Sequence, residues 1–229
     1  MPWGDNPSPP PVLLAEPSNG GIGFQAWVSS ETGGSSSGFF SGLPYGGNGS
    51  GGNVNPINGL QSANSFSFGQ YGQGLNNFSR SFRSLRSPLM VGGDIVVRIG
   101  GNYRNGAKGV YFNTTSDNPN QNKFGIQFAS NRIEYYTRAS NIWTDTGITY
   151  TPNGQCLHIT FQRITSTTGT GIIQLFGTGP GSAITVNFGT GDGNLAIDQL
   201  ELFCGSTDVS PSNENNFYFN FLSAYNAWR

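Results

Sequence analysis

The side chains that could do chemistry are few, and His158 is the first of them. It is the only histidine in the chain, and a histidine on a strand can act as a general base. Because there is no second histidine and no Gly-x-Ser-x-Gly motif, the sequence predicts no serine-type triad. We favour the alternative, a strand histidine that is hydrogen-bonded locally.

Acidic side chains offer little more. Hydrolysis of a glycosidic bond needs two carboxylates on one face, about 5 to 10 Å apart. The closest pair along one predicted strand is Asp198 and Glu201, and their odd spacing puts them on opposite faces. With 12 acidic residues spread along the chain, the sequence predicts no catalysis by a carboxylate pair.

Two loops rich in Asn and Asp are the candidate metal sites. Calcium prefers oxygen ligands, which Asp117 offers in one loop and Asp192 and Asn194 offer in the other. Each loop carries a single carboxylate, and ordinary Asx turns explain both sequences. We therefore predict no cofactor, with calcium at these loops as the alternative.

Cys156 and Cys204 each lie at the end of a predicted strand. A disulfide between them would suit an oxidising compartment. Two buried thiols explain the pair equally well, so the sequence leaves both alternatives open. No Cys-x-x-Cys or metal-ligand spacing is present.

Aromatic side chains near loops are the remaining candidates. Trp143, Tyr136 and Tyr150 lie in or beside predicted loops, and Trp27 points away from the apolar face predicted for residues 22–28. Flat rings with polar edges stack on sugars and on partner proteins alike. For Trp27, a place on a second core face is the alternative.

The composition limits the classes of partner. Charged residues make up 10% of the 229 residues, against about 25% in an ordinary soluble domain. The net charge is −1, so nothing marks a nucleic-acid surface, and Arg80, Arg83 and Arg86 are interpreted as a solvated strand face. No apolar run approaches the ~18 residues of a membrane span. A weakly charged surface does favour association between copies.

Residues 1–20 are rich in proline and predict an extended arm. Its apolar residues are Trp3, Val12, Leu13 and Leu14. We expect the arm to dock through them on its own sheet or on a neighbouring copy.

Residues 21–229 predict one all-β domain. Apolar residues alternate with polar ones around residues 95–99, 124–135, 157–161 and 184–188. Leu195–Phe203 is apolar on both faces, which indicates a central strand. No window shows helical periodicity, and about a dozen short strands predict a two-sheet antiparallel jelly-roll sandwich.

Three stretches carry a family resemblance: residues 23–42 with their Gly/Ser run, residues 102–110 after a strand, and the closing residues 214–222. Their order and spacing resemble the Gly/Asn-rich, concanavalin A-like jelly-roll modules of bacterial extracellular and surface proteins. The resemblance implies a concanavalin A-like fold, and many such domains bind glycans. Jelly-roll polysaccharide lyases are similar in having tyrosines on C-terminal strands, here Tyr218 and Tyr225, but their histidine motif is not matched around His158.

Together these observations predict a non-enzymatic structural or adhesive building block of an extracellular, filament or virion-surface assembly. Its partners would be other copies of itself, and its location extracellular or on a particle or cell surface. A carbohydrate-binding module, with polysaccharide as partner, is the alternative. A polysaccharide lyase that uses His158 with Tyr218 or Tyr225 is the third hypothesis.

Overall fold

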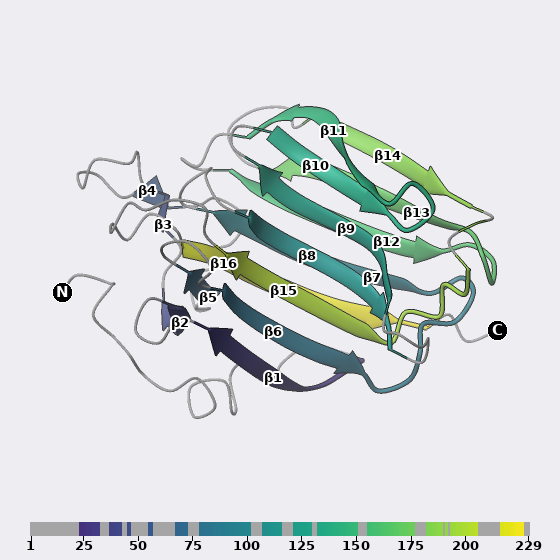
Figure 1. Cartoon of the computed structure of the whole chain (residues 1–229), viewed down its shortest axis with the longest axis horizontal. Coiled ribbons are helices and arrows are strands. Elements are labelled where there is room, and N and C mark those ends of the chain that lie inside the picture. The colour runs from purple at the N-terminus through teal and green to yellow at the C-terminus, as the bar shows by residue number, and fades with distance from the viewer. Residues whose placement is uncertain are drawn as a thin grey trace.

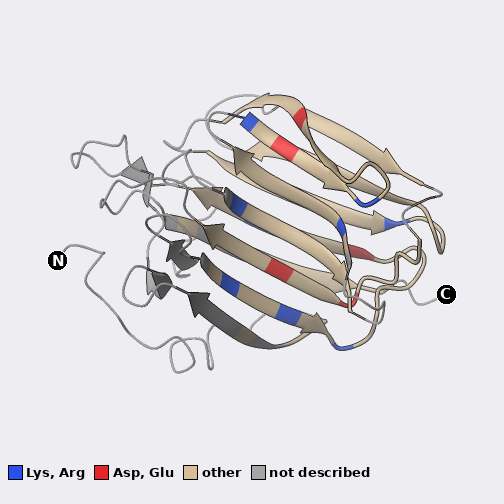
Figure 2. Cartoon of the chain, viewed as in Figure 1, with Lys and Arg blue, Asp and Glu red and all other residues tan. Residues whose placement is uncertain are grey.

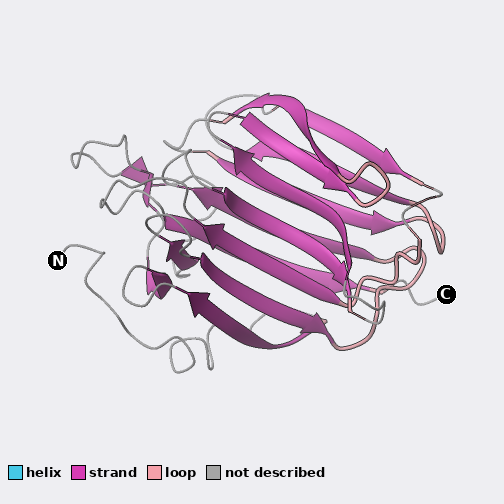
Figure 3. Cartoon of the chain, in the orientation of Figure 1, coloured by secondary structure: helices cyan, strands magenta, loops and turns pink. Residues whose placement is uncertain are grey.

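Two antiparallel β-sheets of seven strands each are stacked on one another (Figure 1). The computed structural model describes residues 23–32, 37–42, 45–46, 55–56, 67–72, 78–101, 107–115, 121–129, 132–150, 155–176, 182–189, 191, 193–205 and 216–226. Within these ranges every regular element is a strand (Figure 3). No helix in them has the length and apolar character that a membrane span requires.

The first sheet, sheet A, faces the viewer in Figure 1. From edge to edge it contains β1 (Phe24–Thr32), β6 (Phe78–Leu85), β15 (Gln199–Gly205), β8 (Ala107–Thr114), β9 (Gln121–Ala129), β10 (Arg132–Thr137) and β11 (Ile142–Thr149).

The second sheet, sheet B, lies behind it. It contains, in order, β14 (Ala183–Phe188), β13 (Gly169–Phe176), β12 (Cys156–Arg163), β7 (Asp94–Gly101), β16 (Asn216–Tyr225), β5 (Ser67–Gly72) and β2 (Ser37–Gly42). A separate pair joins β3 (Tyr45–Gly46) to β4 (Asn55–Pro56).

The core lies between the two sheets because each strand turns alternate apolar side chains inward. Phe161 of β12 stacks on Phe112 of β8, with ring centroids 5.1 Å apart. Phe124 of β9 stacks on Phe188 of β14 at 5.0 Å. These contacts cross from sheet A to sheet B, so they hold the two layers together and confirm the predicted sandwich.

Several strand predictions are confirmed and two need correction. The hairpin predicted at Ser130-Asn131 joins β9 to β10, with Ala129 opposite Arg132. The strand predicted over Leu195–Phe203 is β15. It lies inside sheet A, between β6 and β8, but begins only at Gln199. The central strand β8 and the edge strand β11 were not predicted as strands.

The first strand differs from the sequence pattern. Phe24 and Val28 were predicted to share one face, yet Phe24 is 1% exposed and Val28 is 66% exposed. The register of β1 against β6 shifts between Phe24 and Trp27. Such a bulge moves the following side chains to the opposite face, which explains why Val28 faces solvent.

The interpretation of Arg83 as part of a solvated face is wrong. Arg83 is 1% exposed, whereas Arg80 and Arg86 are exposed. Its Nε donates to the carbonyl of Gln25 at 2.7 Å, and its guanidinium lies 5.1 Å from the ring centre of Phe24. Burial, together with the charge of Arg86, lowers the pKa of Arg83 to about 10.

Candidate functional site

One row of outward-facing residues crosses all seven strands of sheet A. Tyr111 belongs to it: its neighbours Val110 and Phe112 are both fully buried in the core, so the alternation along β8 turns Tyr111 to the outer face. The cross-strand partners of Tyr111 continue the row in both directions. From β1 to β11 it comprises Val28, Phe82, Glu201, Tyr111, Gly125, Tyr136 and Trp143, and we call it the aromatic row.

Three aromatic rings of this row meet above Gly125, which has no side chain. Tyr111 lies 5.6 Å from Trp143 and 6.1 Å from Tyr136, between ring centroids, although Gly125 separates them in the row. A Cβ atom on Gly125 would lie 2.6 Å from the Tyr111 ring and 3.2 Å from the Trp143 ring. The absent side chain therefore allows three rings from three strands to form one cluster.

A tight turn holds two of these rings in place. Residues 138–141 connect β10 to β11, and Asn141 has a φ of 54°, which asparagine tolerates better than most residues. The Tyr136 hydroxyl donates to Asn141 Oδ1 at 3.0 Å. The turn thereby fixes Tyr136 opposite Trp143, and their ring centroids are 5.6 Å apart.

A second row runs beside the aromatic row and is mostly polar. It comprises Arg80, Phe203, Gly109, Gln127, Glu134 and Asp145, and we call it the polar row. Gln127 donates to Glu134 at 2.8 Å, and Phe203 stacks on Tyr111 with centroids 4.9 Å apart. Figure 2 shows that charges of both signs are sparse and scattered over sheet A.

Glu201 is a buried carboxyl in the middle of the aromatic row, 5% exposed. It accepts a hydrogen bond from Asn113 Nδ2 at 3.2 Å and lies 3.6 Å from Arg80. Burial raises the pKa of Glu201 above its usual value, and Arg80 and Asn113 oppose that shift. Burial and the charge of Glu201 also raise the pKa of Tyr111, to about 12. Tyr111 therefore carries a neutral hydroxyl near pH 7.

The predicted stacking residues differ in how far the structure exposes them. Trp143 is half-buried at the end of the aromatic row, whereas Tyr136 is 9% exposed and supports its neighbours. Tyr150 was a wrong prediction, because it is 1% exposed and its hydroxyl bonds Gly101 and the carbonyl of Gln155. Trp27 pairs with Arg83 in the register of β1, and its side chain lies outside the described part.

Sequence reasoning missed Tyr111, Phe82 and Phe203. Tyr111 stands between two apolar residues, so the local pattern does not show that it faces outward. The arm residues Trp3, Val12, Leu13 and Leu14 lie outside the described residues.

His158 lies on the outer face of sheet B, between the buried residues Leu157 and Ile159 of β12. Arg98 Nε donates to His158 Nδ1 at 3.1 Å, which agrees with the favoured prediction of a locally bonded histidine. Tyr225 pairs with Asp94, and Asp94 pairs with Gln162, four residues along β12 from His158. At about 3.3 Å per residue, four residues along the strand put His158 and Tyr225 too far apart to act together, so that pairing is wrong. The side chain of Tyr218 lies outside the described residues.

The single histidine gives the first testable prediction. Burial, and then the charge of Arg98, lowers the pKa of His158 below its usual value of about 6.5. The unfolded chain therefore takes up this proton first, so His158 makes the free energy of unfolding fall as pH drops through about 6.5. The fall should be smaller in His158→Gln when both proteins are unfolded with urea between pH 7.5 and 5.5, two values that bracket about 6.5.

Burial raises the pKa values of Asp94 and Glu201, so these groups make the free energy of unfolding rise as pH drops. Their contribution is the same in wild type and in His158→Gln. They therefore cancel in the difference between wild type and variant. Identical pH profiles for the two proteins would show that Arg98 and burial leave His158 unaffected.

The candidate calcium ligands gain no support. Asn194 Oδ1 accepts from the Ala196 amide at 3.0 Å and from Arg163 Nη2 at 3.3 Å. A guanidinium at that distance repels a cation, so Asn194 is unsuited to bind calcium. Asp117 and Asp192 lie outside the described residues, and the described residues contain no group of three His, Cys, Asp or Glu side chains placed for a metal.

The two cysteines are free, buried thiols. Cys156 lies on β12 of sheet B and Cys204 on β15 of sheet A, so the disulfide alternative is not formed. Burial raises the pKa of Cys156 to about 12, which makes it a poor nucleophile.

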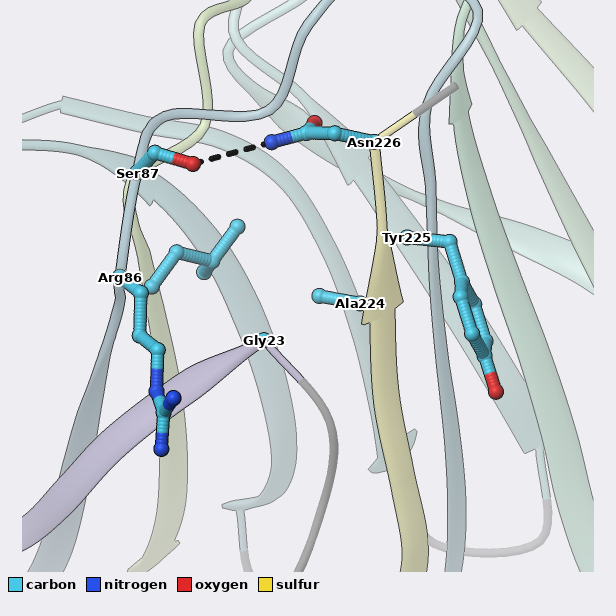
Figure 4. Close-up of a pocket in the computed structure, with 7 residues that line it drawn as sticks. Gly23, Arg86, Ser87, Ala224, Tyr225 and Asn226 are labelled. Atoms are coloured by element: carbon cyan, nitrogen blue, oxygen red, sulfur yellow. Dashed lines mark hydrogen bonds between the residues drawn. The ribbon is translucent and has the colours of Figure 1, made fainter. Parts of the chain in front are cut away.

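A hollow of about 350 Å³ lies where β1 begins and β16 ends (Figure 4). Asn226 closes one side by donating to Ser87 Oγ at 3.0 Å and accepting from the Met90 amide at 2.7 Å. Gly23 lines another side with a φ of 89°, and the Ala224 carbonyl leaves no room there for a Cβ atom. The contacts are those of a structural junction between the two sheets.

Comparison with known proteins gives structural neighbours only. No family model matches the sequence, and no curated protein matches it. Similar solved structures include arcelin-5, a lectin-like defense protein from Phaseolus vulgaris, at 10% identity and a TM-score of 0.40, over 82% of this chain and 96% of that one.

Two further neighbours have the same character. A legume lectin-like domain from Entamoeba histolytica has 11% identity and a TM-score of 0.42, over 83% of this chain and 90% of that one. The Ca2+-bound exoplasmic/lumenal domain of VIP36 has 11% identity and a TM-score of 0.36, over 78% and 88%. These are legume lectin-like folds, and likeness at this level assigns no ligand and no activity to the chain.

Proposed function

We propose that this protein is a non-enzymatic carbohydrate-binding module whose binding surface is the outer face of sheet A. The observation that carries the proposal is the aromatic row, with Tyr111 and Trp143 half-buried and the polar row directly beside it. Sugar rings would stack on the aromatic rings while their hydroxyl groups bond to the neighbouring polar side chains.

The hydrogen-bonding capacity of this face supports a hydroxyl-rich ligand. Glu134 and Asp145 offer acceptors, Gln127 offers both functions, and Arg80 offers donors. Asn113 Oδ1 is buried and has no hydrogen-bond partner among the described residues. Because charges of both signs are sparse on this face, it suits a neutral glycan better than a strongly charged one. An extracellular or surface location is part of this proposal and is supported by the low charge and the Gly- and Asn-rich composition.

Catalysis is not part of the proposal. Of the two tyrosines that the lyase hypothesis names, Tyr225 lies at a distant register position from His158, and the side chain of Tyr218 lies outside the described part of the chain. The assembly hypothesis retains its support from the low net charge, and its arm stays a prediction.

The test is binding by Trp143→Ala on a glycan array, followed by calorimetry on any glycan that wild type binds. Loss of a large aromatic contact costs about 1.5 to 3 kcal/mol, so we expect affinity to fall by roughly tenfold or more. Ile142→Ala is the matched control, since Ile142 is the preceding residue of β11, is 62% exposed and lies outside the aromatic row.

A blank array for wild type would count against the proposal. Equal affinities for wild type and Trp143→Ala, with a glycan bound, would move the site away from the aromatic row.

A further inference from the structure

Strand β14 forms an open edge of sheet B. Among the strands that the structure describes, it is the last in the sheet order and pairs with β13 alone. The pairing runs from Gly169 opposite Phe188 to Gln174 opposite Ala183 without a register shift. An edge strand presents backbone N–H and C=O groups that can pair with another chain.

The register identifies which backbone groups of β14 are directed outward. The Leu175 amide donates to the Ser182 carbonyl at 2.8 Å, so this opposed pair is of the hydrogen-bonded type. Hydrogen-bonded and non-hydrogen-bonded pairs alternate along an antiparallel ladder. Ile184 and Val186 therefore bond to β13, while Ala183, Thr185 and Asn187 direct their backbone groups to the open edge.

Both edges of sheet A carry features that discourage pairing. β11 has a register shift, Gly147 at a φ of 74° and the charged residue Asp145. β1 has a bulge and contains Glu31. Natural sheets block their edges with charges, prolines and bulges, and β14, whose sequence is AITVNF, has none of these.

The outer face next to β14 is also uncharged. Thr185 continues across the sheet to Ile172 and Thr160, and Asn187 continues to Thr170 and Gln162. Figure 2 shows β14 without a charged position. Two copies that meet here bring no like charges together, which suits the low net charge of the whole chain.

We propose that two copies of this chain pair through β14, antiparallel and with a two-fold axis at Thr185, to form a continuous sheet of fourteen strands. Thr185 then faces Thr185 of the second copy, and Ala183 faces Asn187 once on each side of the axis. These three opposed pairs are all of the hydrogen-bonded type and form about six backbone hydrogen bonds. Thr–Thr pairs on one face also stabilise a sheet.

The dimer has a consequence for binding that rests on the proposed function. A two-fold axis between antiparallel strands stands perpendicular to the sheet, so both copies turn the outer face of sheet A to the same side. Both aromatic rows would then face one glycan-bearing surface, and the second binding event would become intramolecular.

The first test is the mass in solution, by light scattering over a dilution series. Wild type should reach twice the 24.4 kDa of one chain. Thr185→Pro removes one outward N–H group and leaves the ladder with β13 intact, so it should stay a folded monomer by circular dichroism. Thr185→Lys should do the same, because two like charges would be opposed. Val28→Lys, at another exposed strand position on the far edge of sheet A, should dimerise as wild type does.

The second test fixes the register. Opposed Cα atoms in a hydrogen-bonded pair are about 5.5 Å apart, which a disulfide can bridge. Thr185→Cys should give a covalent dimer under mild oxidation, while Val28→Cys should not, since both native thiols are buried. A monomeric wild type, or a dimer that survives Thr185→Pro unchanged, would overturn the proposal. Both masses are measured without glycan, so their failure is separate from failure of the proposed function.

Discussion

Phe161→Ala should lower the free energy of unfolding by about 3 to 5 kcal/mol, the range for truncating a buried phenylalanine. Phe161 is fully buried. It contacts Phe112, Phe124 and Phe188, with ring centroids 5.1, 6.0 and 5.5 Å away. These rings come from both sheets, so the cavity would open where the layers meet and could not be filled by one side chain. Urea unfolding, followed by fluorescence, measures the loss.

Phe176→Ala is the matched control for this prediction. Phe176 belongs to β13, next to β12, but is 41% exposed on the outer face of sheet B, where it contacts Arg98. Its truncation should cost about 1 kcal/mol or less, because little apolar area is returned to water. Equal losses for the two variants would mean that the stacked rings between the sheets do not dominate the stability.

The size of this effect matters because domains are stable by only about 5 to 15 kcal/mol. A loss of 3 to 5 kcal/mol would therefore remove a large share of the total. We expect Phe161→Ala to be the most destabilising of the single changes considered in the sandwich.

Most of the strands that the sequence predicted have one apolar and one polar face. In β12 the inner positions Leu157, Ile159 and Phe161 are apolar and the outer positions His158, Thr160 and Gln162 are polar, so a period of two is visible without any structure. The same rule fails for β8, where Tyr111 on the outer face interrupts the alternation between Val110 and Phe112. An aromatic residue on the outer face thus hides the strand that carries it.

The edge strand β11 was missed for the opposite reason. Its inner positions include Thr144 and Thr146, so it lacks the apolar half of the pattern. Without β8 and β11 no sequence argument could assemble the aromatic row, which depends on the register of six strand pairs. The sequence indicated Trp143 as a candidate stacking residue by its residue type alone. Its contact with Tyr111 could not be predicted in that way.

Tyr150 shows the limit of residue type as evidence. It follows β11 directly, and a tyrosine beside a loop was interpreted as exposed. Its ring instead lies 4.4 Å from that of Phe128, between centroids, inside the core. Its hydroxyl is satisfied by backbone groups of Gly101, 49 residues away, a partner that no local pattern indicates.

Gly125→Val should strongly weaken glycan binding while leaving the sandwich folded. The new side chain would occupy the space where Tyr111 and Trp143 meet, and its nearest contacts are ring atoms rather than backbone. The rings must move apart, because the Cβ atom alone would lie 2.6 Å from Tyr111. We expect affinity to fall at least as far as in Trp143→Ala, with a changed near-ultraviolet circular dichroism spectrum.

The cost in stability should be moderate, about 1 to 3 kcal/mol for overpacking, partly offset by the preference of valine for strands. Ala129→Val is the control, since Ala129 lies on the same face of β9 two rows away and pairs with Arg132. Gly109 is a poor substitute for Gly125, because a Cβ atom there would collide with the Ile126 carbonyl and disturb the backbone. If Gly125→Val alters the spectrum but retains full affinity, the ring cluster is a structural support and the glycan binds elsewhere.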